Sequence, residues 1–284
     1  MHFYRIVFQS IEDALYEEML AAGEEEKRIA IEKGRVSRNP DGSPGLPWIA
    51  VVVDGSWGTR SHGHKYSSKG GMAGIIGVET KKLLYYGVRN KYCVVCARAS
   101  LGSVPDHRCH RNWEGSSTAM ETDIVVKGFL ESESMHGVQF LEMIGDGDSS
   151  VYKNIISKVP YGRHVRKIEC ANHVTKCYTT GLYKIAKESA ETRRLLTVPR
   201  IKRMTVTMRT VIKHHALQSE AGERPSADCA RELASDAGNA AFHVLGHHDQ
   251  CKSYYCNVAR NPESHENHQI HHVGKDSRIF VKGC

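Results

Sequence analysis

Two aspartates stand where stretches of apolar residues end and glycine follows. Asp54 closes "WIAVVVDG" and Asp146 closes "FLEMIGDG". In an open α/β sheet, side chains just beyond the ends of neighbouring strands gather at one edge. Two carboxylates there offer the hard oxygen ligands that Mg²⁺ or Mn²⁺ prefers, and such a site can hold two ions about 4 Å apart for phosphodiester chemistry. We therefore predict a catalytic metal site at Asp54 and Asp146, with Glu121 directed into the same space.

Each aspartate is also compatible with a different role. Aspartate before glycine is a common turn residue that binds nothing. The string "DGDS" resembles the start of a calcium loop, but Ser150 and Val151 stand where a further ligand and the obligatory glycine are needed, so a calcium loop is excluded. A strand that ends in Asp-x-Asp is also compatible with a phosphoaspartyl phosphatase, which stays as a competing enzyme class.

Cysteines and histidines gather in one segment with the spacing of a zinc site. The stretch "CVVCARASLGSVPDHRCH" begins with a C-x-x-C knuckle and ends with a second group of ligands after an ordinary loop length. The alternative is a set of buried cysteines that bind no metal, and His110 is an alternative fourth ligand. The expected zinc ligands are Cys93, Cys96, His107 and Cys109.

A second group of cysteines and histidines lies near the end of the chain, with a less familiar spacing. Its expected zinc ligands are His243, His248, Cys251 and Cys256, with His247 as a spare. Between the two groups, Cys170 and His173 stand three residues apart at a junction from strand to helix. Two residues cannot close a metal site, so they either brace the active site or lie in the core.

Composition limits the class of protein. Nine cysteines, an odd number, without an export signal favour a reducing compartment with thiolates on metal rather than a disulfide framework. No apolar run approaches the roughly 20 residues of a membrane helix, so no membrane partner is expected. The net charge of +7 suits a polyanionic partner.

Positive charge is concentrated in two places. Asp54 is followed at once by a segment rich in Arg, His and Lys, and the stretch "RRLLTVPRIKRMTVTMRTVIKHH" carries a second concentration. Such residues neutralise phosphates, although a charged helix face in solvent explains the second stretch equally well. The candidate DNA contacts are Arg60, Lys65, Arg200, Lys202 and Arg203.

The elements that must position these residues follow from hydrophobic periodicity. Three β-rich segments, a helix and two further strands predict an α/β fold, with a mixed sheet covered by helices. Ahead of them, near-helical spacing over residues 11–33 predicts an amphipathic helix, followed by a Pro- and Gly-rich linker. The expected domains are an N-terminal helix and linker (1–47), the core (48–180), a helical insertion (181–242) and a Cys/His-rich tail (243–284).

Several strings in this order resemble the Mutator-like transposase domain of arthropod type, over roughly residues 40–256. They are "VVVDGSWGTRSHGHKYSS", "GVRNKYCVVCAR", "NWEGSSTAMETDIVVKGF", "IGDGDSSVYKNI", "PYGRHVRKIECANHV" and "HVLGHHDQC". The resemblance implies an RNase H-like core of the DDE transposase superfamily, interrupted by a helical insertion, that cuts DNA by two-metal chemistry.

The resemblance also implies roles for individual residues. Asp54 would be the first catalytic aspartate and Asp146 the second, with Asp148 in reserve. Cys170 and His173 match the C-x-x-H element that follows the second aspartate. The implied partners are transposon terminal inverted repeats and target DNA, with a homo-oligomer and a nuclear location also expected. The implied cofactors are Mg²⁺ or Mn²⁺ at the aspartates and Zn²⁺ at the Cys/His segments.

The sequence departs from the family pattern at its third acid. A glutamate on a late helix is expected beyond the Cys/His segment, and only Glu232 and Asp236 offer substitutes. His247 also stands where related sequences carry an acid. We therefore expect a truncated, inactive copy as one outcome, and a zinc-stabilised DNA-binding remnant without catalysis as the alternative to an enzyme.

Overall fold

The computed structural model describes residues 2–38, 42–58, 68–99, 104–146, 149–220 and 226–261. They fall into two compact units, Met1–Cys170 and Ala171–Cys284, which we call the sheet unit and the helical unit. Within the described ranges, no helix combines the length and the apolar character needed to cross a membrane.

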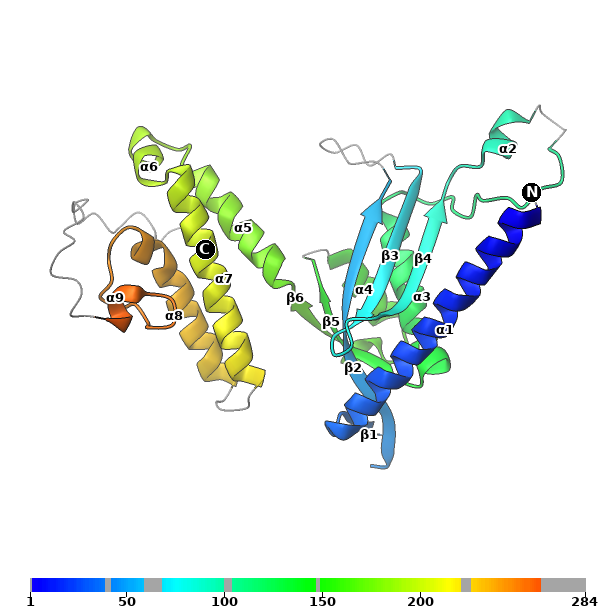
Figure 1. The fold of residues 1–284 in the computed structure, drawn as a ribbon, viewed down its shortest axis with the longest axis horizontal. Helices are drawn as coiled ribbons and strands as arrows, with labels where there is room; N and C mark the ends of the chain where they lie inside the picture. Colours follow the sequence, from blue (N-terminus) through cyan, green and yellow to red (C-terminus); the bar gives the residue numbers. More distant parts are fainter. Residues whose placement is uncertain are drawn as a thin grey trace. The chain divides into compact units, whose positions relative to one another are not determined.

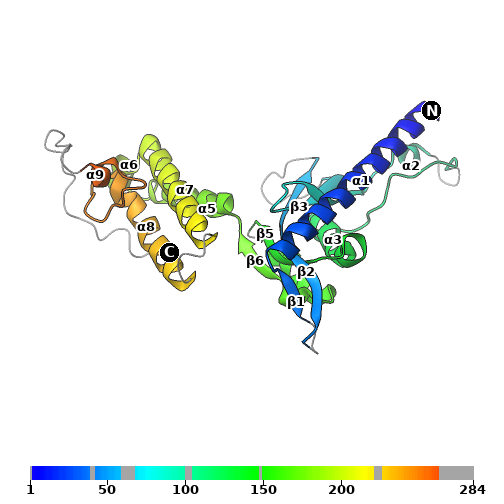
Figure 2. The same cartoon turned by 60° about the horizontal axis from the view of Figure 1, so that its bottom comes forward.

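The sheet unit contains six strands and several helices (Figures 1 and 2). The strands are β1 (Val36–Arg38), β2 (Pro44–Trp57), β3 (Gly70–Gly77), β4 (Leu83–Asn90), β5 (Gln139–Gly145) and β6 (Arg166–Glu169). The helices are α1 (His2–Glu32), α2 (Val94–Arg98), α3 (Ala119–His136), α4 (Ser149–Lys158) and a 3₁₀ turn at Gly162–His164.

The sheet is mixed, with strand order β4-β3-β2-β5-β6 and β1 paired to β2 at its side. The strands β2, β3 and β4 run antiparallel, whereas β5 and β6 continue the sheet in parallel with β2. This confirms the expected mixed α/β sheet flanked by helices. The long strand β2 is central, because the antiparallel half and the parallel half of the sheet meet on it.

The helix α3 covers one face of the sheet. Val51 and Ile75 point toward it and are fully buried. Gly128 of α3 permits close approach, since a Cβ there would lie 2.5 Å from Ile75 Cδ1. The helix ends at Gly137, whose φ of +64° suits glycine and whose amide donates to the Glu133 carbonyl.

The opposite face of the same strands is more open. Met72 and Val88, which pair across β3 and β4, are 51% and 48% exposed. Asp54 is exposed on β2, one residue after the buried Val53. Since side chains alternate along a strand, Asp54 belongs to this open face.

Glu26 joins α1 to the turn between β3 and β4. Its side chain is fully buried, and Oε1 accepts hydrogen bonds from the amides of Glu79 and Thr80 at 3.0 and 2.7 Å and from the Thr80 hydroxyl at 2.9 Å. A Cβ at Gly77 would lie 2.1 Å from this oxygen, so only glycine fits there. The long N-terminal helix is thus attached to the sheet by a buried carboxylate.

The helical unit consists of α5 (Ala171–Ile185), α6 (Ala190–Leu195), α7 (Val198–Glu220), α8 (Ser226–Val244) and α9 (Asn257–Arg260). Helix α7 packs against both α5 and α8. Leu182, Ile201, Met204 and Ala241 belong to the core between them. Ser189 starts α6 with a capping box, in which its hydroxyl accepts from the Thr192 amide.

We predict that Glu26→Ala lowers the free energy of unfolding by about 2 kcal/mol, because it leaves three partly buried donors without their acceptor. Glu25→Ala is the matched control. Glu25 is more exposed and pairs with Lys82 at the surface, so its loss should leave the urea midpoint almost unchanged. Urea denaturation measures both, and equal midpoints for the two variants would contradict this role of Glu26.

Candidate functional site

The register between β2 and β5 brings the two predicted catalytic aspartates to neighbouring positions. Val52 pairs with Ile144 in the parallel ladder, and Asp54 and Asp146 lie two residues further along each chain. Gly145 lies against the same strand, since a Cβ there would be 3.7 Å from the Val53 carbonyl oxygen. Paired strands are about 4.8 Å apart, so the two aspartates leave the sheet at one level. Both are exposed.

Glu121 approaches the same part of β2 from the side of α3. Its carboxyl carbon lies 2.6 Å from the position that a Cβ of Gly55 would take, so this glycine makes room for the carboxylate. The start of α3 is held there by Trp57, whose indole N–H donates to the Ser117 carbonyl at 3.0 Å. Strand alternation sends Asp54 to the opposite face of the sheet, so Glu121 lies behind the backbone of Gly55 and, unlike the expectation from sequence, is not directed into the space that Asp54 faces.

Some of the predicted site residues have no described position. Asp148, Arg60 and Lys65 lie outside the described residues. Cys170 and His173 are described, one in each unit. The amide of Cys170 donates to the carbonyl of Gly145, next to Asp146, at 3.0 Å, and His173 Nε2 lies 3.4 Å from Cys177 Sγ on α5.

The first Cys/His group converges as expected. His107 Nε2 lies 3.3 Å from both Cys93 Sγ and Cys96 Sγ, and Cys96 Sγ lies 3.5 Å from Cys109 Sγ. The four ligand atoms lie within 4.8 Å of one another. Ligands of one tetrahedral zinc ion are roughly 3.5 Å apart, so the group can hold such an ion. His110, the alternative ligand, is not a member.

The surroundings of this first group favour metal ligation. His107 Nδ1 lies 2.8 Å from the Pro105 carbonyl, which fixes the ring and leaves Nε2 for a metal. Hydrogen bonds from the backbone amides of Cys96 and His110 lower the pKa of Cys93 to about 6. The lowered pKa favours the thiolate of Cys93, which is the form that binds Zn²⁺, although hydrogen bonds with neighbouring groups raise the pKa of Cys96 and of His107.

The second Cys/His group also converges, in the helical unit. Cys251 Sγ lies 3.4 Å from His243 Nδ1, and His248 Nδ1 lies 3.4 Å from Cys256 Sγ. All four ligand atoms lie within 4.8 Å of one another, so this group too can hold a metal ion such as Zn²⁺. Burial lowers the pKa of His243, which keeps the ring neutral as a ligand must be.

A buried polar network that the sequence analysis missed attaches the second group to α7 and α8. Tyr254, between two of the cysteines, donates to Asp236 Oδ2 at 2.8 Å. The same carboxylate oxygen lies 3.0 Å from His215 Nε2, and both side chains are almost fully buried. Asn239 donates to Tyr255 at 2.8 Å. Asp236, Asn239 and His243 are three and four residues apart in the sequence, so they lie on one face of α8. This spacing is the sequence signal from which the cluster could have been predicted.

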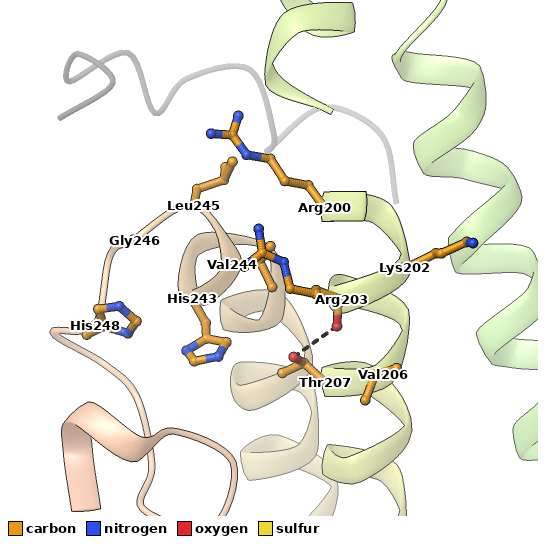
Figure 3. Close-up of a pocket in the computed structure, with 10 residues that line it drawn as sticks. All are labelled: Arg200, Lys202, Arg203, Val206, Thr207, His243, Val244, Leu245, Gly246 and His248. Atoms are coloured by element: carbon orange, nitrogen blue, oxygen red, sulfur yellow. Dashed lines mark hydrogen bonds between the residues drawn. The ribbon is translucent and has the colours of Figure 1, made fainter. Parts of the chain in front are cut away.

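The three predicted DNA contacts of the second positive stretch, Arg200, Lys202 and Arg203, lie in the first two turns of α7. Arg200 and Arg203 extend toward the segment after α8, whereas Lys202 points the other way (Figure 3). The three predicted DNA contacts of this helix therefore do not form one continuous stripe. All three belong to the lining of a cavity beside the second Cys/His group, and the two arginine side chains extend toward it.

The chain is similar to known proteins at the level of a family. The model of the family described as Mutator-like transposase matches residues 5–256. This match includes both aspartates and both Cys/His groups. No curated protein and no solved structure is significantly similar to the chain.

We predict that the purified chain holds one zinc ion in each Cys/His group. Cys96→Ser and Cys256→Ser should each remove one equivalent, because each substitution takes a thiolate from a different group. Cys177→Ser is the matched control, since this exposed cysteine belongs to neither group and should leave both ions bound. Metal content by mass spectrometry decides, and a loss of zinc from Cys177→Ser equal to that from Cys96→Ser would refute the assignment.

Proposed function

Because the chain belongs to the Mutator-like transposase family, we propose that it is a DNA transposase that cuts DNA and transfers strands with divalent metal ions. The observation that carries the proposal is the parallel register of β2 and β5, which supports a close approach of Asp54 and Asp146. Two carboxylates from adjacent strands are a suitable donor set for Mg²⁺ or Mn²⁺, since both are hard oxygen ligands at an exposed position.

We further propose that the sheet is RNase H-like. Three antiparallel strands, then a crossover helix α3 and two strands parallel to the first, agree with the arrangement that family membership leads one to expect. In this proposal the core serves to hold the two aspartates at one edge.

Each acidic residue has a proposed role. Asp54 and Asp146 bind the cations and fix their positions, Asp148 is a reserve ligand, and Glu121 supports Asp54 from the side of α3. When bound, the ions supply an activated water or 3′-hydroxyl and stabilise the leaving oxygen of the phosphodiester. The protein's own contribution is rigid placement, because Asp54 lies on β2 and Asp146 directly follows its neighbour β5.

We propose transposon terminal inverted repeats and target DNA as the substrates, a nuclear location and a homo-oligomeric assembly. The positive charge of Arg60, Lys65, Arg200, Lys202 and Arg203 supports DNA binding, since each phosphate contact releases counterions. The Cys/His groups contribute by stabilising the surrounding segments, with no part in the cleavage reaction.

The second candidate function is a zinc-stabilised DNA-binding remnant without catalysis. The position of Asp236 favours it, since this substitute for the third acid is 4% exposed and is occupied by His215 and Tyr254. A carboxylate that is buried and already hydrogen-bonded in this way is poorly available as a cation ligand. This function predicts salt-sensitive DNA binding that persists when Mg²⁺ is chelated.

We predict that Asp54→Asn and Asp146→Asn each lower Mg²⁺-dependent nicking of terminal inverted-repeat DNA by about 1000-fold, since each removes a cation ligand. Glu121→Gln should lower it by about 10-fold, because its role is support rather than direct ligation. Asp123→Asn is the matched control, as Asp123 is on the same helix and is engaged by Arg89 at 2.6 Å.

Equal nicking by the unaltered chain and Asp54→Asn would contradict the catalytic proposal. Salt-sensitive DNA binding without any Mg²⁺-dependent nicking would instead support the remnant. A loss of activity in Asp123→Asn as large as that in Glu121→Gln would show that α3 acts through general stability only. Gel analysis of end-labelled DNA measures all four variants.

A further inference from the structure

The helical unit contains a cavity of about 530 Å³ beside the second Cys/His group (Figure 3). One wall is formed by the first turns of α7, and the other by the end of α8 with the segment that follows it. His243 and His248, two members of the second Cys/His group, form part of its lining. This volume lies within the range of about 300–1,000 Å³ typical of small-ligand sites.

Two arginines give the cavity a positive charge. Arg200 and Arg203 both line it, and in Figure 3 both guanidinium groups extend into the space between α7 and residues 244–246. In the part of the chain that the structure describes, no carboxylate forms an ion pair with either. Arg200 Nη1 donates a hydrogen bond to the Leu195 carbonyl at 3.0 Å, which orients the side chain. The other N–H groups of the guanidinium can donate to a ligand.

On the α7 side of the cavity, the sequence carries no acid near the arginines, whereas Asp249 follows His248 on the other side. Residues 193–219 include no aspartate or glutamate. Arg203 is close enough to His243 for its charge to help lower the pKa of that ring. An anion between the two arginines would therefore find concentrated positive charge, and a guanidinium suits the geometry of a phosphate group.

Three apolar side chains also line the cavity. Val206, which is 60% exposed, lines it together with Val244 and Leu245. An inorganic anion alone makes no use of such a surface. A nucleotide uses both parts, since its phosphate pairs with the arginines and its sugar and base cover apolar side chains.

We propose that this cavity binds one nucleotide of the DNA, with its phosphate on Arg200 and Arg203 and its sugar and base against Val206, Val244 and Leu245. The inference rests on the proposed function for the identity of the ligand. It assigns the helical unit a contact to a single nucleotide, in addition to the salt-dependent attraction of its basic surface. Because His243 and His248 line the cavity, its shape depends on the second Cys/His group.

The test uses the zinc-loaded full chain and two probes, a 5′-phosphorylated thymidine dinucleotide and a labelled 25-base-pair duplex. Arg200→Ala and Arg203→Ala should each weaken binding of the dinucleotide by about 10-fold, since each removes a charged hydrogen bond to phosphate. The slope of log K against log salt for the duplex should fall by about 0.9 for each phosphate that a variant no longer neutralises. Calorimetry and fluorescence anisotropy measure the two probes.

Arg209→Ala is the matched control, with the same residue type on the same helix, exposed and outside the cavity lining. It should leave binding of the dinucleotide unchanged, and Val206→Asp should abolish that binding by placing a carboxylate in the cavity. Thermal melts within a few degrees of the unaltered chain show that each variant is folded.

Two results would overturn the proposal. One is dinucleotide binding by Arg203→Ala equal to that of the unaltered chain, and the other is an equal loss from Arg209→Ala, which would indicate a diffuse basic surface. The proposed transposase activity is tested separately. If the unaltered chain binds the dinucleotide through Arg203 but does not nick DNA, the transposase proposal fails and the cavity proposal stands. Binding of inorganic phosphate as tight as that of the dinucleotide would also overturn the nucleotide assignment.

Discussion

The parallel pairing of β2 with β5 is the constraint on which the proposed chemistry depends. These strands are far apart in sequence, and only their register puts Asp54 and Asp146 at one level. The register is fixed by burial, because Val51 and its partner Met143 both point to the face that α3 covers. A slip of one residue in this register would turn the apolar side chains of β5 toward solvent and would move Asp146 away from Asp54. The same register is therefore required for core packing and for the geometry of the site.

The two Cys/His groups, one in each unit, have a structural role that differs from that of the aspartates, because each can order a segment of the chain. Each collects its ligands from a helix or knuckle and from a segment with few large apolar side chains. Such segments bury too little surface to become ordered by packing, so metal ligation can supply the missing free energy. In the helical unit, the Tyr254, Asp236 and His215 network adds a second attachment of the same segment to α7 and α8. The same segment forms one wall of the cavity that we propose as a nucleotide site.

Much of this organisation could be predicted from sequence, where local patterns decide. The helix expected over residues 11–33 exists within α1, which begins earlier at His2, and both ligand sets follow from the spacing of cysteine and histidine. Strand alternation alone fails in β5, where Phe140 and Met143 are both buried although they are three residues apart. A bulge opposite Ile49 and Ala50 puts them on one face and gives Asp146 its direction. The His215 and Asp236 contact joins residues 21 positions apart on two helices, so the one-face pattern of α8 identifies Asp236 but not its partner on α7.

The most direct test of the central claim is the position of a Mn²⁺ ion in crystals of the chain, located by its anomalous scattering. We predict a peak bound by the carboxylates of Asp54 and Asp146 that disappears in Asp54→Asn. A peak that persists in that variant, or carboxyl groups held well over about 10 Å apart, too far for cations about 4 Å apart to be shared, would contradict this claim.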